Sequence, residues 1–503
     1  MAFVVVHAAV WTLVPTIANH NLPLDVVEAL AWGHEWQWGY AKHPPLSAWL
    51  AELAWSPRAA WGLYLLSQIM VGGAFWATWR LARDVLEPWP ATLSVIAMAA
   101  VHYHGFSAVE FNSNVVQFPL WALASLAFWR AVRGSHLGWW LVLGIAASLG
   151  VLGKHSFLLL PGAMGVFLLL HPDGRRTLST LGPYLAAAAF VIVLLPHALW
   201  TVANGFPGLA YAAARSAAEA PPDLGGRLLG TLDFLAAQLL AVGPLVVALC
   251  LLGRPCPRPG RPGRDAWLLV TLGAGPLASM VVLGVAGVGL RDMWAAPVFT
   301  TAGPMLMLAL RPADLSQARF HVRRFAWGLG AWLSFGLALA LAAGLAGPAL
   351  TGRFERAHFP GQELARAIEE RWREATDAPL AIVVGDEWVA GNAAAYARKR
   401  PSVYLRADAA LAPWLDDAAV RQQGAMVVWT ADKRGTQPSR LELSPLADLR
   451  ERFPGLVEEP PLALRARWLG GAATVYVNWA LVPPERLTDG LPDRSRRQGK
   501  VDR

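Results

Sequence analysis

The residues of this chain best suited to acid–base chemistry lie close to its start, just after an opening apolar run. Asp25 and Glu28 are three residues apart, so on a helix they share one face. They belong to the stretch from Asn21 to Trp49, whose tryptophans favour short helices at a membrane interface. A carboxylate there can accept the proton of a hydroxyl group. Asp25 and Glu28 are therefore both candidates for a general base.

Four basic residues lie in the same stretch or in short turns between apolar runs. Lys42 and His43 precede two prolines, Lys154 lies in a Gly-Lys-His-Ser turn, and Arg291 begins Arg-Asp-Met-Trp. Lys154 and Arg291 have almost no loop to extend into, and an ionisable group at the apolar boundary is costly and indicates function. Cations there suit a phosphate or pyrophosphate group on a lipid. The competing interpretation of Lys154 is snorkelling towards lipid headgroups.

A third polar group lies in the motif Val-Glu-Phe-Asn-Ser-Asn, which contains Glu110, Asn112 and Asn114. We expect these residues on the same membrane face as the others, where they contact an acceptor or support the catalytic groups. An aromatic belt with solvated charges accounts for His34 and Glu35. A belt has no need of charges of both signs, so it does not account for Asp25 or the Lys-His-Pro-Pro run.

Long apolar segments must position these groups. The chain has 503 residues, of which 55% are hydrophobic and 16% charged, whereas about 25% of a soluble domain is charged. Uncharged runs such as Leu141–Leu152 and Leu239–Leu252 approach, with their flanks, the roughly 20 residues that cross hydrocarbon. We therefore expect about eleven spans and exclude a large soluble helical protein. The spans are predicted near 2–18, 59–82, 91–108, 114–131, 137–153, 154–171, 180–202, 231–253, 265–288, 292–310 and 325–347.

Arginine marks one set of alternate connections between these spans. That set contains Arg80, Arg83, Arg130, Arg133, Arg175, Arg176, Arg254, Arg258, Arg261, Arg264, Arg311, Arg319, Arg323 and Arg324. Positive loops face the cytoplasm, so the candidate site and everything after the last span are expected outside it. The chain has a net charge of +8, and its basic residues concentrate in these loops. This pattern is typical of topology control and lipid contact and not of nucleic-acid binding.

The composition changes after the last predicted span. We expect an all-α polytopic membrane domain over 1–350, a small α/β extracytoplasmic domain over 354–485, and a disordered polar tail over 486–503. The expected strands are Leu380–Gly385, Ser402–Leu405, Ala425–Thr430 and Thr474–Trp479, and a helix is expected over Gln362–Ala375.

Four motifs resemble, in order, those of the membrane glycosyltransferases of family 39. That GT-C group includes dolichyl-phosphate-mannose protein mannosyltransferases and bacterial aminoarabinose transferases that act on lipid A. The first motif is Leu24-Asp-Val-Val-Glu-Ala-Leu, followed by Gly39-Tyr-Ala-Lys-His-Pro-Pro-Leu-Ser-Ala-Trp. The others are Phe111-Asn-Ser-Asn-Val-Val-Gln-Phe-Pro-Leu-Trp121, Leu152-Gly-Lys-His-Ser156 and Arg291-Asp-Met-Trp-Ala-Ala-Pro297. The match covers roughly residues 1–310.

The resemblance implies an inverting glycosyltransferase of the cytoplasmic (inner) membrane of a bacterial-type cell. Its donor would be a sugar linked to polyprenyl phosphate, and its acceptor, which the sequence does not name, a lipid, a glycan or a protein. Asp25 would be the catalytic base. The resemblance places Lys42, His43, Lys154 and Arg291 around the lipid phosphate. It places Tyr40, Glu110, Asn112 and Asn114 at the acceptor or in support of the catalytic groups.

Two departures from the family pattern concern metal binding. The family often has adjacent Asp-Glu where two valines separate Asp25 from Glu28 here, and often has Asp at the place of Asn114. Two hard oxygen ligands are thus missing or moved. No cofactor is assigned, and a divalent metal held by Glu110 with His43 stays open.

A lipid or glycolipid transporter or flippase is the competing function. Transporters place ionisable groups near the bilayer midplane, often on broken helices. Here the candidate groups gather at one face of the membrane, which favours an enzyme.

Overall fold

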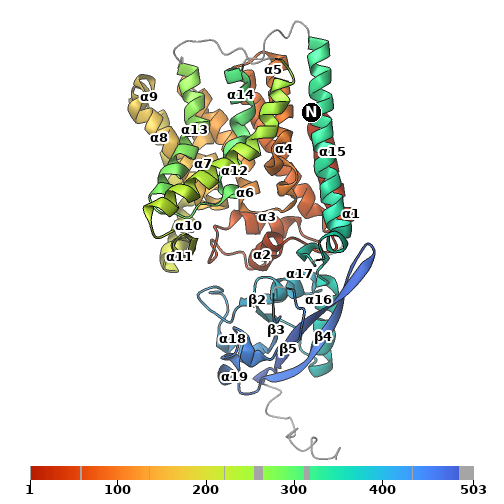
Figure 1. Ribbon diagram of the computed structural model, residues 1–503. Coiled ribbons are helices and arrows are strands. Elements are labelled where there is room, and N and C mark those ends of the chain that lie inside the picture. The colour runs from red at the N-terminus through yellow and green to blue at the C-terminus, as the bar shows by residue number, and fades with distance from the viewer. Residues whose placement is uncertain are drawn as a thin grey trace, which may run out of the picture. The chain divides into compact units, whose positions relative to one another are not determined.

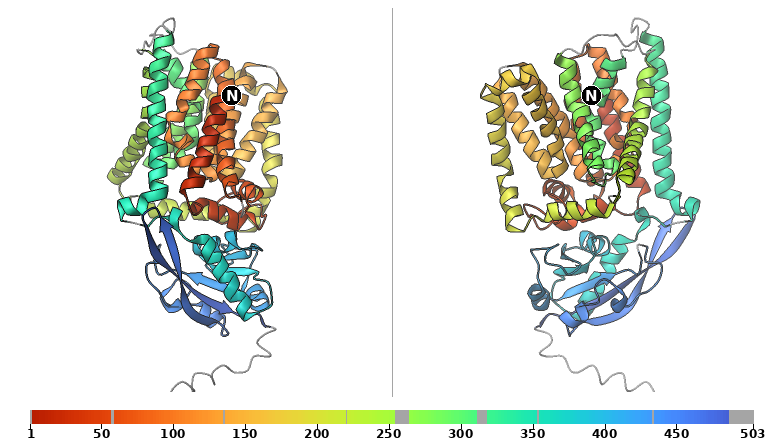
Figure 2. Two further views of the ribbon diagram at one scale, coloured as in Figure 1. Left: turned by 90° about the vertical axis from the view of Figure 1, so that its right-hand side faces the viewer. Right: turned by 60° about the vertical axis from the view of Figure 1, so that its left-hand side comes forward.

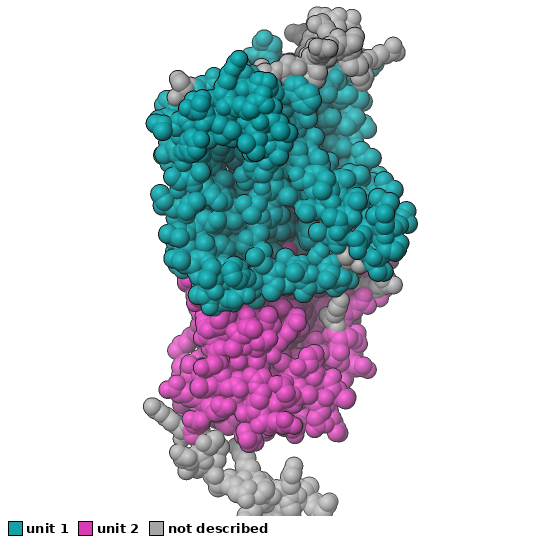
Figure 3. Space-filling view, turned by 90° about the vertical axis from the view of Figure 1, so that its left-hand side faces the viewer, with its two compact units in different colours: residues 1–17, 38–50, 61–341 teal, residues 18–37, 51–60, 342–503 magenta. Residues whose placement is uncertain are grey.

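The computed structural model describes residues 2–56, 59–134, 136–219, 221–253, 264–310, 318–352, 354–432 and 434–485. The chain packs as two compact units, shown in different colours in Figure 3. The first comprises residues 1–17, 38–50 and 61–341, and the second comprises 18–37, 51–60 and 342–503. The expected tail over 486–503, and residues 254–263 of the arginine-rich run, lie outside the described residues.

The first unit is helical. Its α-helices are α1 (Ala2–Ala18), α4 (Trp61–Arg83), α5 (Pro88–Ala97), α6 (Ser113–Arg133), α7 (Leu137–Gly153), α8 (Leu159–Leu170), α9 (Pro172–Leu178), α10 (Gly182–Ala203), α11 (Pro207–Glu219), α12 (Leu224–Cys250), α13 (Arg264–Val285), α14 (Ala302–Leu310) and α15 (Ala318–Thr351). Short 3₁₀ helices are η1 (Met98–Ala100), η2 (His102–His104), η3 (Ser107–Val109), η4 (His155–Leu158) and η5 (Asp292–Thr301). Most of these helices run side by side, whereas α11 turns away from the direction of α10 (Figure 2).

Helices of this unit pack closely where small residues face each other. α6 packs against α4 and α7, and α7 packs against α10. A side chain at Gly144 of α7 would overlap the backbone of Ala186 on α10, which is the close approach that small residues permit between apolar helices. Large aromatic residues such as Trp121 and Phe128 fill the core of this unit.

A helix forms at each predicted span. Among the described residues, six helices are long and apolar enough to cross a membrane, or eight if each of two bent helix pairs counts as one span. One bent pair is Pro88–Ala100 with His102–Val109, at 88°, and the other is His155–Leu170 with Pro172–Leu178, at 98°. The spanning window of α6 is 78% buried and that of α15 is 11% buried. α6 is therefore an inner helix, and α15 exposes most of its apolar surface.

The second unit contains a five-stranded sheet with helices. Its elements are α2 (Leu24–Gly33), η7 (Arg356–His358), α16 (Gly361–Ala375), β1 (Ile382–Gly385), α17 (Val389–Tyr396), β2 (Ser402–Leu405), α18 (Asp417–Gln423), β3 (Ala425–Trp429), η8 (Leu441–Leu443), α19 (Leu449–Arg452), β4 (Val457–Trp468) and β5 (Gly471–Val482). α3 (Leu46–Ala54) begins in the first unit and ends in the second. The strand order is β2-β1-β3-β5-β4. Figure 1 shows the long strands β4 and β5 of this sheet side by side.

The sheet is parallel on one side and antiparallel on the other. β1 pairs in parallel with β2 and β3, while β5 pairs antiparallel with both β3 and β4. Every residue of β1 and β3 is buried, as expected for strands covered on both faces. The expected strands and the helix over Gln362–Ala375 are present, whereas β4 was not predicted.

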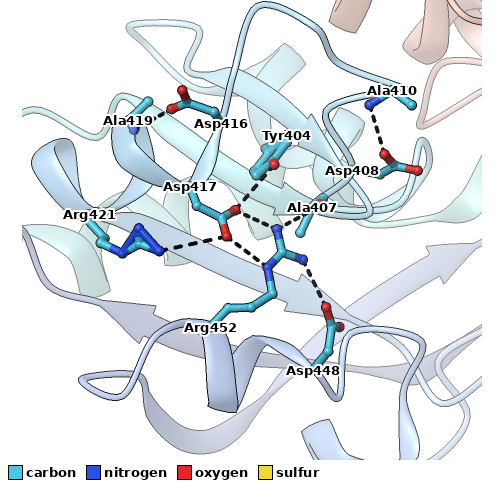
Figure 4. A network of polar contacts seen from close by, with 10 residues as sticks. All are labelled: Tyr404, Ala407, Asp408, Ala410, Asp416, Asp417, Ala419, Arg421, Asp448 and Arg452. Atoms are coloured by element: carbon cyan, nitrogen blue, oxygen red, sulfur yellow. Dashed lines mark hydrogen bonds and ion pairs between the residues drawn. The ribbon is translucent and has the colours of Figure 1, made fainter.

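An arginine holds the connections around α18 together. Arg452 donates to both carboxylate oxygens of Asp417, with Nη2–Oδ1 and Nε–Oδ2 distances of 2.5 and 3.0 Å, and to Asp448 at 2.9 Å (Figure 4). It also donates to the carbonyl of Ala407 at 2.8 Å. The Arg452 hydrogen bond lowers the pKa of Asp417. This network joins α18, α19 and the loop after β2, so we assign it to the stability of the sheet unit.

Candidate functional site

Lys154 follows the C-terminal end of α7 and contacts a polar and an aromatic side chain in the first unit. Its ammonium donates to Oδ1 of Asn114 at 2.6 Å and lies 5.7 Å from the centre of the Trp294 ring. Asn114 is buried in the first turn of α6. The Asn112 side chain caps this helix by accepting the backbone N–H groups of Asn114 and Val115 at 2.9 and 3.3 Å. Lys154 is half-buried, and its ammonium has a hydrogen-bond partner within the unit.

Lys42 and His43 lie in the loop before α3, in the same unit. The backbone N–H of Tyr40, itself buried, donates to the carbonyl of His43 at 3.1 Å. The Lys42 ammonium lies 6.0 Å from the centre of the Tyr211 ring. Burial, and then the charges of Lys154, Lys42 and His155, hold the pKa of His43 well below its usual range. The structure therefore brings three of the predicted residues together, and His43 is neutral among the two ammonium groups.

Beside this group lies a histidine pair that the sequence reasoning missed. Nε2 of His155 and Nε2 of His197 are 3.3 Å apart, and Nδ1 of His197 lies 2.7 Å from the carbonyl of Trp38. A carbonyl only accepts, so His197 carries its proton on Nδ1 and His155 donates to it. The available signal was an ionisable side chain within the apolar run 180–202. We call Lys42, His43, Lys154, His155 and Asn114 the basic cluster.

Arg291 is engaged by an acidic partner. Its Nη2 donates to Glu219 at 2.5 Å, and its Nε lies 3.1 and 3.2 Å from the two carboxylate oxygens. Arg215 also binds Glu219, at 2.8 Å. Glu219 ends α11 and was not among the predicted site residues. Trp294, three residues after Arg291, has its ring beside the Lys154 ammonium of the basic cluster.

Glu110 and Asn112 are the remaining predicted site residues of the first unit, and Glu110 was also considered as a metal ligand. Glu110 follows η3, is half-buried, and donates its backbone N–H to Ser107. Asn112, predicted at the acceptor, serves here as the cap of α6. Within the described ranges, no group of three or more His, Cys, Asp or Glu side chains is arranged to hold a metal ion.

Asp25 and Glu28 lie on α2, in the second unit. Asp25 is half-buried in the first turn, where a carboxylate is favoured by the helix dipole, and Glu28 is buried. The helix is held by residues from the C-terminal part of the chain. The hydroxyl of Tyr396 accepts the backbone N–H of Leu22 at 3.2 Å. A side chain at Gly391 of α17 would press on Val27 at 2.7 Å, so α2 and α17 pack in direct contact.

Arg400 joins the last turn of α2 to α3. Its Nη2 donates to the carbonyl of Leu30 at 3.0 Å and to Glu52 at 2.8 Å. Glu52 also lies 3.5 Å from Nδ1 of His34. Burial acts to raise the pKa of Glu52, but the hydrogen bond from His34 and the Arg400 guanidinium together lower it. Burial raises the pKa of the neighbouring Glu35. Charges of both signs thus meet beside α2, with Glu52 ionised.

These contacts define two sets of chemical groups. The basic cluster offers ammonium, imidazole and amide donors, the set that binds phosphate oxygens. α2 offers carboxylates at a helix start, which can accept protons. The structure brings Lys42, His43, Lys154 and Asn114 together within the first unit, and Asp25 with Glu28 within the second.

Comparison with known proteins gives a family model that matches part of the chain, two similar curated proteins and a similar fold. A family model described as dolichyl-phosphate-mannose-protein mannosyltransferase matches residues 42–200. The lipopolysaccharide core galacturonosyltransferase RgtB of Rhizobium johnstonii is 24% identical, over 83% of this chain and 84% of that protein. RgtA of the same organism, with the same activity, is 23% identical over 89% and 88%.

A solved structure has the same fold. ArnT from Cupriavidus metallidurans, bound to undecaprenyl phosphate, matches with a TM-score of 0.64 at 14% identity, over 95% of this chain and 97% of that chain. Its apo state matches with a TM-score of 0.61 at 13% identity. The chain is a multi-pass membrane protein, and its resemblance to the GT-C membrane glycosyltransferases is confirmed.

Proposed function

We propose that this protein transfers a sugar from a polyprenyl-phosphate donor to a glycolipid of the cell envelope. The observation that carries the proposal is the basic cluster, in which Lys154, Lys42 and a neutral His43 gather with the buried amide of Asn114. Such a set matches a lipid-linked phosphate better than a carboxylate or a neutral ligand, because it supplies several donors with two positive charges. The similar fold of ArnT, bound to undecaprenyl phosphate, supports the same donor class.

The reaction is a single displacement with Asp25 as base. The Asp25 carboxylate takes the proton of the acceptor hydroxyl while that oxygen bonds to the anomeric carbon. The bond from the anomeric carbon to the phosphate oxygen breaks, and polyprenyl phosphate leaves with the electron pair. Lys42 and Lys154 stabilise the charge that develops on this phosphate. One displacement inverts the anomeric centre.

The relatives narrow the sugar and the acceptor to be tested first. RgtA and RgtB are named for transfer of galacturonic acid to the lipopolysaccharide core. We therefore propose a uronic acid as the sugar and a lipopolysaccharide-type glycolipid as the acceptor. Arg291 and Arg215 both bind Glu219. Trp294, three residues after Arg291, contacts Lys154 of the basic cluster. These three charged residues are candidates for contacts with a charged sugar or acceptor.

The test is a transfer assay with purified protein in lipid nanodiscs. Polyprenyl-phosphate galacturonic acid and lipopolysaccharide lacking that sugar should yield a glycolipid heavier by one uronic acid residue, together with free polyprenyl phosphate, both measured by mass spectrometry. Movement of the intact donor lipid across vesicles without transfer to any acceptor would instead establish the flippase.

The site is proposed on the extracytoplasmic face, because the arginine-rich connections lie on the other side of the predicted spans. A cysteine in place of Asn204, in the connection after α10, should react with a membrane-impermeant thiol reagent added to intact cells. Labelling of this position only after the membrane is opened would invert the orientation.

A further inference from the structure

The turn between β4 and β5 docks on the end of α15. The two-residue turn consists of Leu469 and Gly470, and Gly470 has a φ of 87°, which glycine adopts without strain. The backbone N–H of Leu469 donates to the carbonyl of Leu345 at 2.8 Å. Trp468 lies edge-on to His358, with ring centres 6.3 Å apart. All of these residues belong to the second unit.

Pro348 frees one carbonyl of α15 beside the docking point. A proline has no N–H, so it leaves the carbonyl four residues earlier, that of Gly344, without its usual helical donor, and its ring disturbs the turn there. Nε2 of His358 donates to the freed carbonyl of Gly344 at 2.8 Å, and the backbone N–H of Leu469 donates to the adjacent carbonyl of Leu345. Unsatisfied carbonyls cost several kcal/mol in hydrocarbon. The hairpin is therefore fixed to the helix at this level.

The docking point belongs to a helix that qualifies as a membrane span. The apolar helix His321–Thr351 has 31 residues and only 11% of its spanning window is buried. At 1.5 Å per residue it is about 46 Å long, compared with about 30 Å of hydrocarbon. Leu345 lies six residues before its end, or about 9 Å along the axis. Leu350, still further along, is 72% exposed and apolar. Leu345 thus lies at the boundary between hydrocarbon and headgroups.

The turn carries the residues that suit such a boundary. Leu469 is 69% exposed although it is apolar. Arg465 and Arg467 are exposed on β4, two residues apart and thus on one face of the strand. The backbone N–H of Arg465 donates to the Glu363 carboxylate at 3.4 Å. An apolar tip flanked by an aromatic ring and by basic residues is typical of segments that lie at a membrane interface.

We infer that the β4–β5 turn inserts into the interfacial layer of the membrane that α15 crosses. Leu469 enters the edge of the apolar layer, and Arg465 with Arg467 faces the lipid phosphates. The occupant of this surface is lipid, because the turn is bonded to a carbonyl on a helix that exposes most of its apolar window. The inference concerns membrane contact of the sheet unit and does not depend on which reaction the protein catalyses.

Site-directed spin labelling of the full-length protein tests this inference. Cys250→Ser and Cys256→Ser remove the native thiols, and single cysteines at 469, 350 and 443 then carry a nitroxide in nanodiscs of phosphatidylethanolamine and phosphatidylglycerol. The ratio of collisions with oxygen to collisions with a nickel chelate rises with membrane depth. Leu469→Cys should give a ratio severalfold above that of Leu443→Cys, which is 81% exposed in the same unit, and at least as high as that of Leu350→Cys, which lies beyond Leu345 on α15.

A spin label at a second position, 467, tests the depth of the turn without relying on the Leu469→Cys variant alone. Arg467→Cys should give a ratio between those of 443 and 469, as expected at headgroup level. Each variant is compared by its unfolding midpoint, so that only folded proteins are interpreted. A ratio at 469 equal to that at 443 would overturn the inference, as would low collision rates with both reagents, because those indicate burial in protein.

Discussion

The two halves of the stretch 18–50 are built into different parts of the molecule. Residues 18–37, with α2 and the candidate base Asp25, pack with the C-terminal sheet, while residues 38–50, with Lys42 and His43, pack with the helices. Tyr396 and Arg400 hold the first half. Residues that are adjacent in the sequence thus pack in different units. The candidate proton acceptor and the candidate phosphate site are each held by the hydrophobic core of a different unit.

The halves also differ in charge. The acidic residues Asp25 and Glu28 lie in the first half, and Lys42 lies in the second beside Lys154. If α2 serves the proton transfer and the basic cluster serves the donor phosphate, changes in one half should alter turnover and changes in the other should alter donor affinity. The predictions below use this separation.

Truncation after Gly352 should have the largest effect. It removes Tyr396, Gly391 and Arg400, on which α2 depends, and leaves the basic cluster complete. We expect turnover to be abolished while the affinity for donor lipid stays within a few-fold of the intact protein, as measured by tryptophan quenching or isothermal titration. A folded truncated protein with normal turnover would show that α2 needs no support from the sheet unit.

Lys154→Ala should lower the affinity for donor lipid. The variant loses a charge-assisted hydrogen bond to phosphate worth about 1.5–3 kcal/mol, which corresponds to a roughly ten- to hundred-fold rise in Kd. Lys399→Ala is the matched control, because Lys399 is exposed in the sheet unit. Unchanged donor binding in Lys154→Ala would remove this residue from the phosphate site.

Arg400→Ala should reduce turnover by roughly tenfold with little change in donor affinity. The arginine donates to the α2 carbonyl of Leu30 and to Glu52, and loss of about 1.5 kcal/mol in positioning raises the barrier by that factor. Arg398→Ala serves as control, since Arg398 is an exposed neighbour. Arg400→Lys should recover part of the rate. An equal loss in the control and in Arg400→Ala would indicate a general loss of folding.

His43 should give the smallest effect, seen in the pH dependence of stability. Its folded-state pKa lies well below the unfolded value of 6.5, so below about pH 6.5 the unfolded chain binds more protons and the free energy of unfolding falls. In His43→Asn this acid-side decrease should be smaller than in the wild type, measured by unfolding midpoints between pH 7.5 and 5.5. His20→Asn, at an exposed position, should retain the full decrease. A wild-type decrease in His43→Asn would contradict the assignment.

Local patterns predicted most of the fold. Apolar runs gave the helices, and β-branched runs gave β1 and β3, because burial on both faces leaves a continuous apolar signature. β4 was missed because it contains Glu458, Glu459 and two prolines and exposes alternate residues. The bend after Ala100 was missed because His102, His104 and Gly105 were included in one predicted span over 91–108, although they interrupt its apolar run.

The sequence predicted which residues could belong to the site better than it predicted the contacts between them. Lys154 and Asn114 were both candidates, but nothing local indicated their hydrogen bond across 40 residues. Arg291 was expected to be available for phosphate, and its bond to Glu219 depends on the packing of α11. His197 was overlooked as one polar residue in an apolar span. Each miss is a long-range contact, which a sequence of one chain does not encode in its spacing.

The most direct test of the division between the two halves is Asp25→Asn, assayed for donor binding and for turnover in the same preparation. The amide keeps the size and hydrogen bonding of the carboxylate but does not accept the acceptor's proton. We predict a fall in turnover of about 100-fold or more, with donor-lipid Kd unchanged within a few-fold. Near-normal turnover would contradict the account and transfer the role of base to Glu28, and a matching loss of donor binding would show that α2 holds the donor itself.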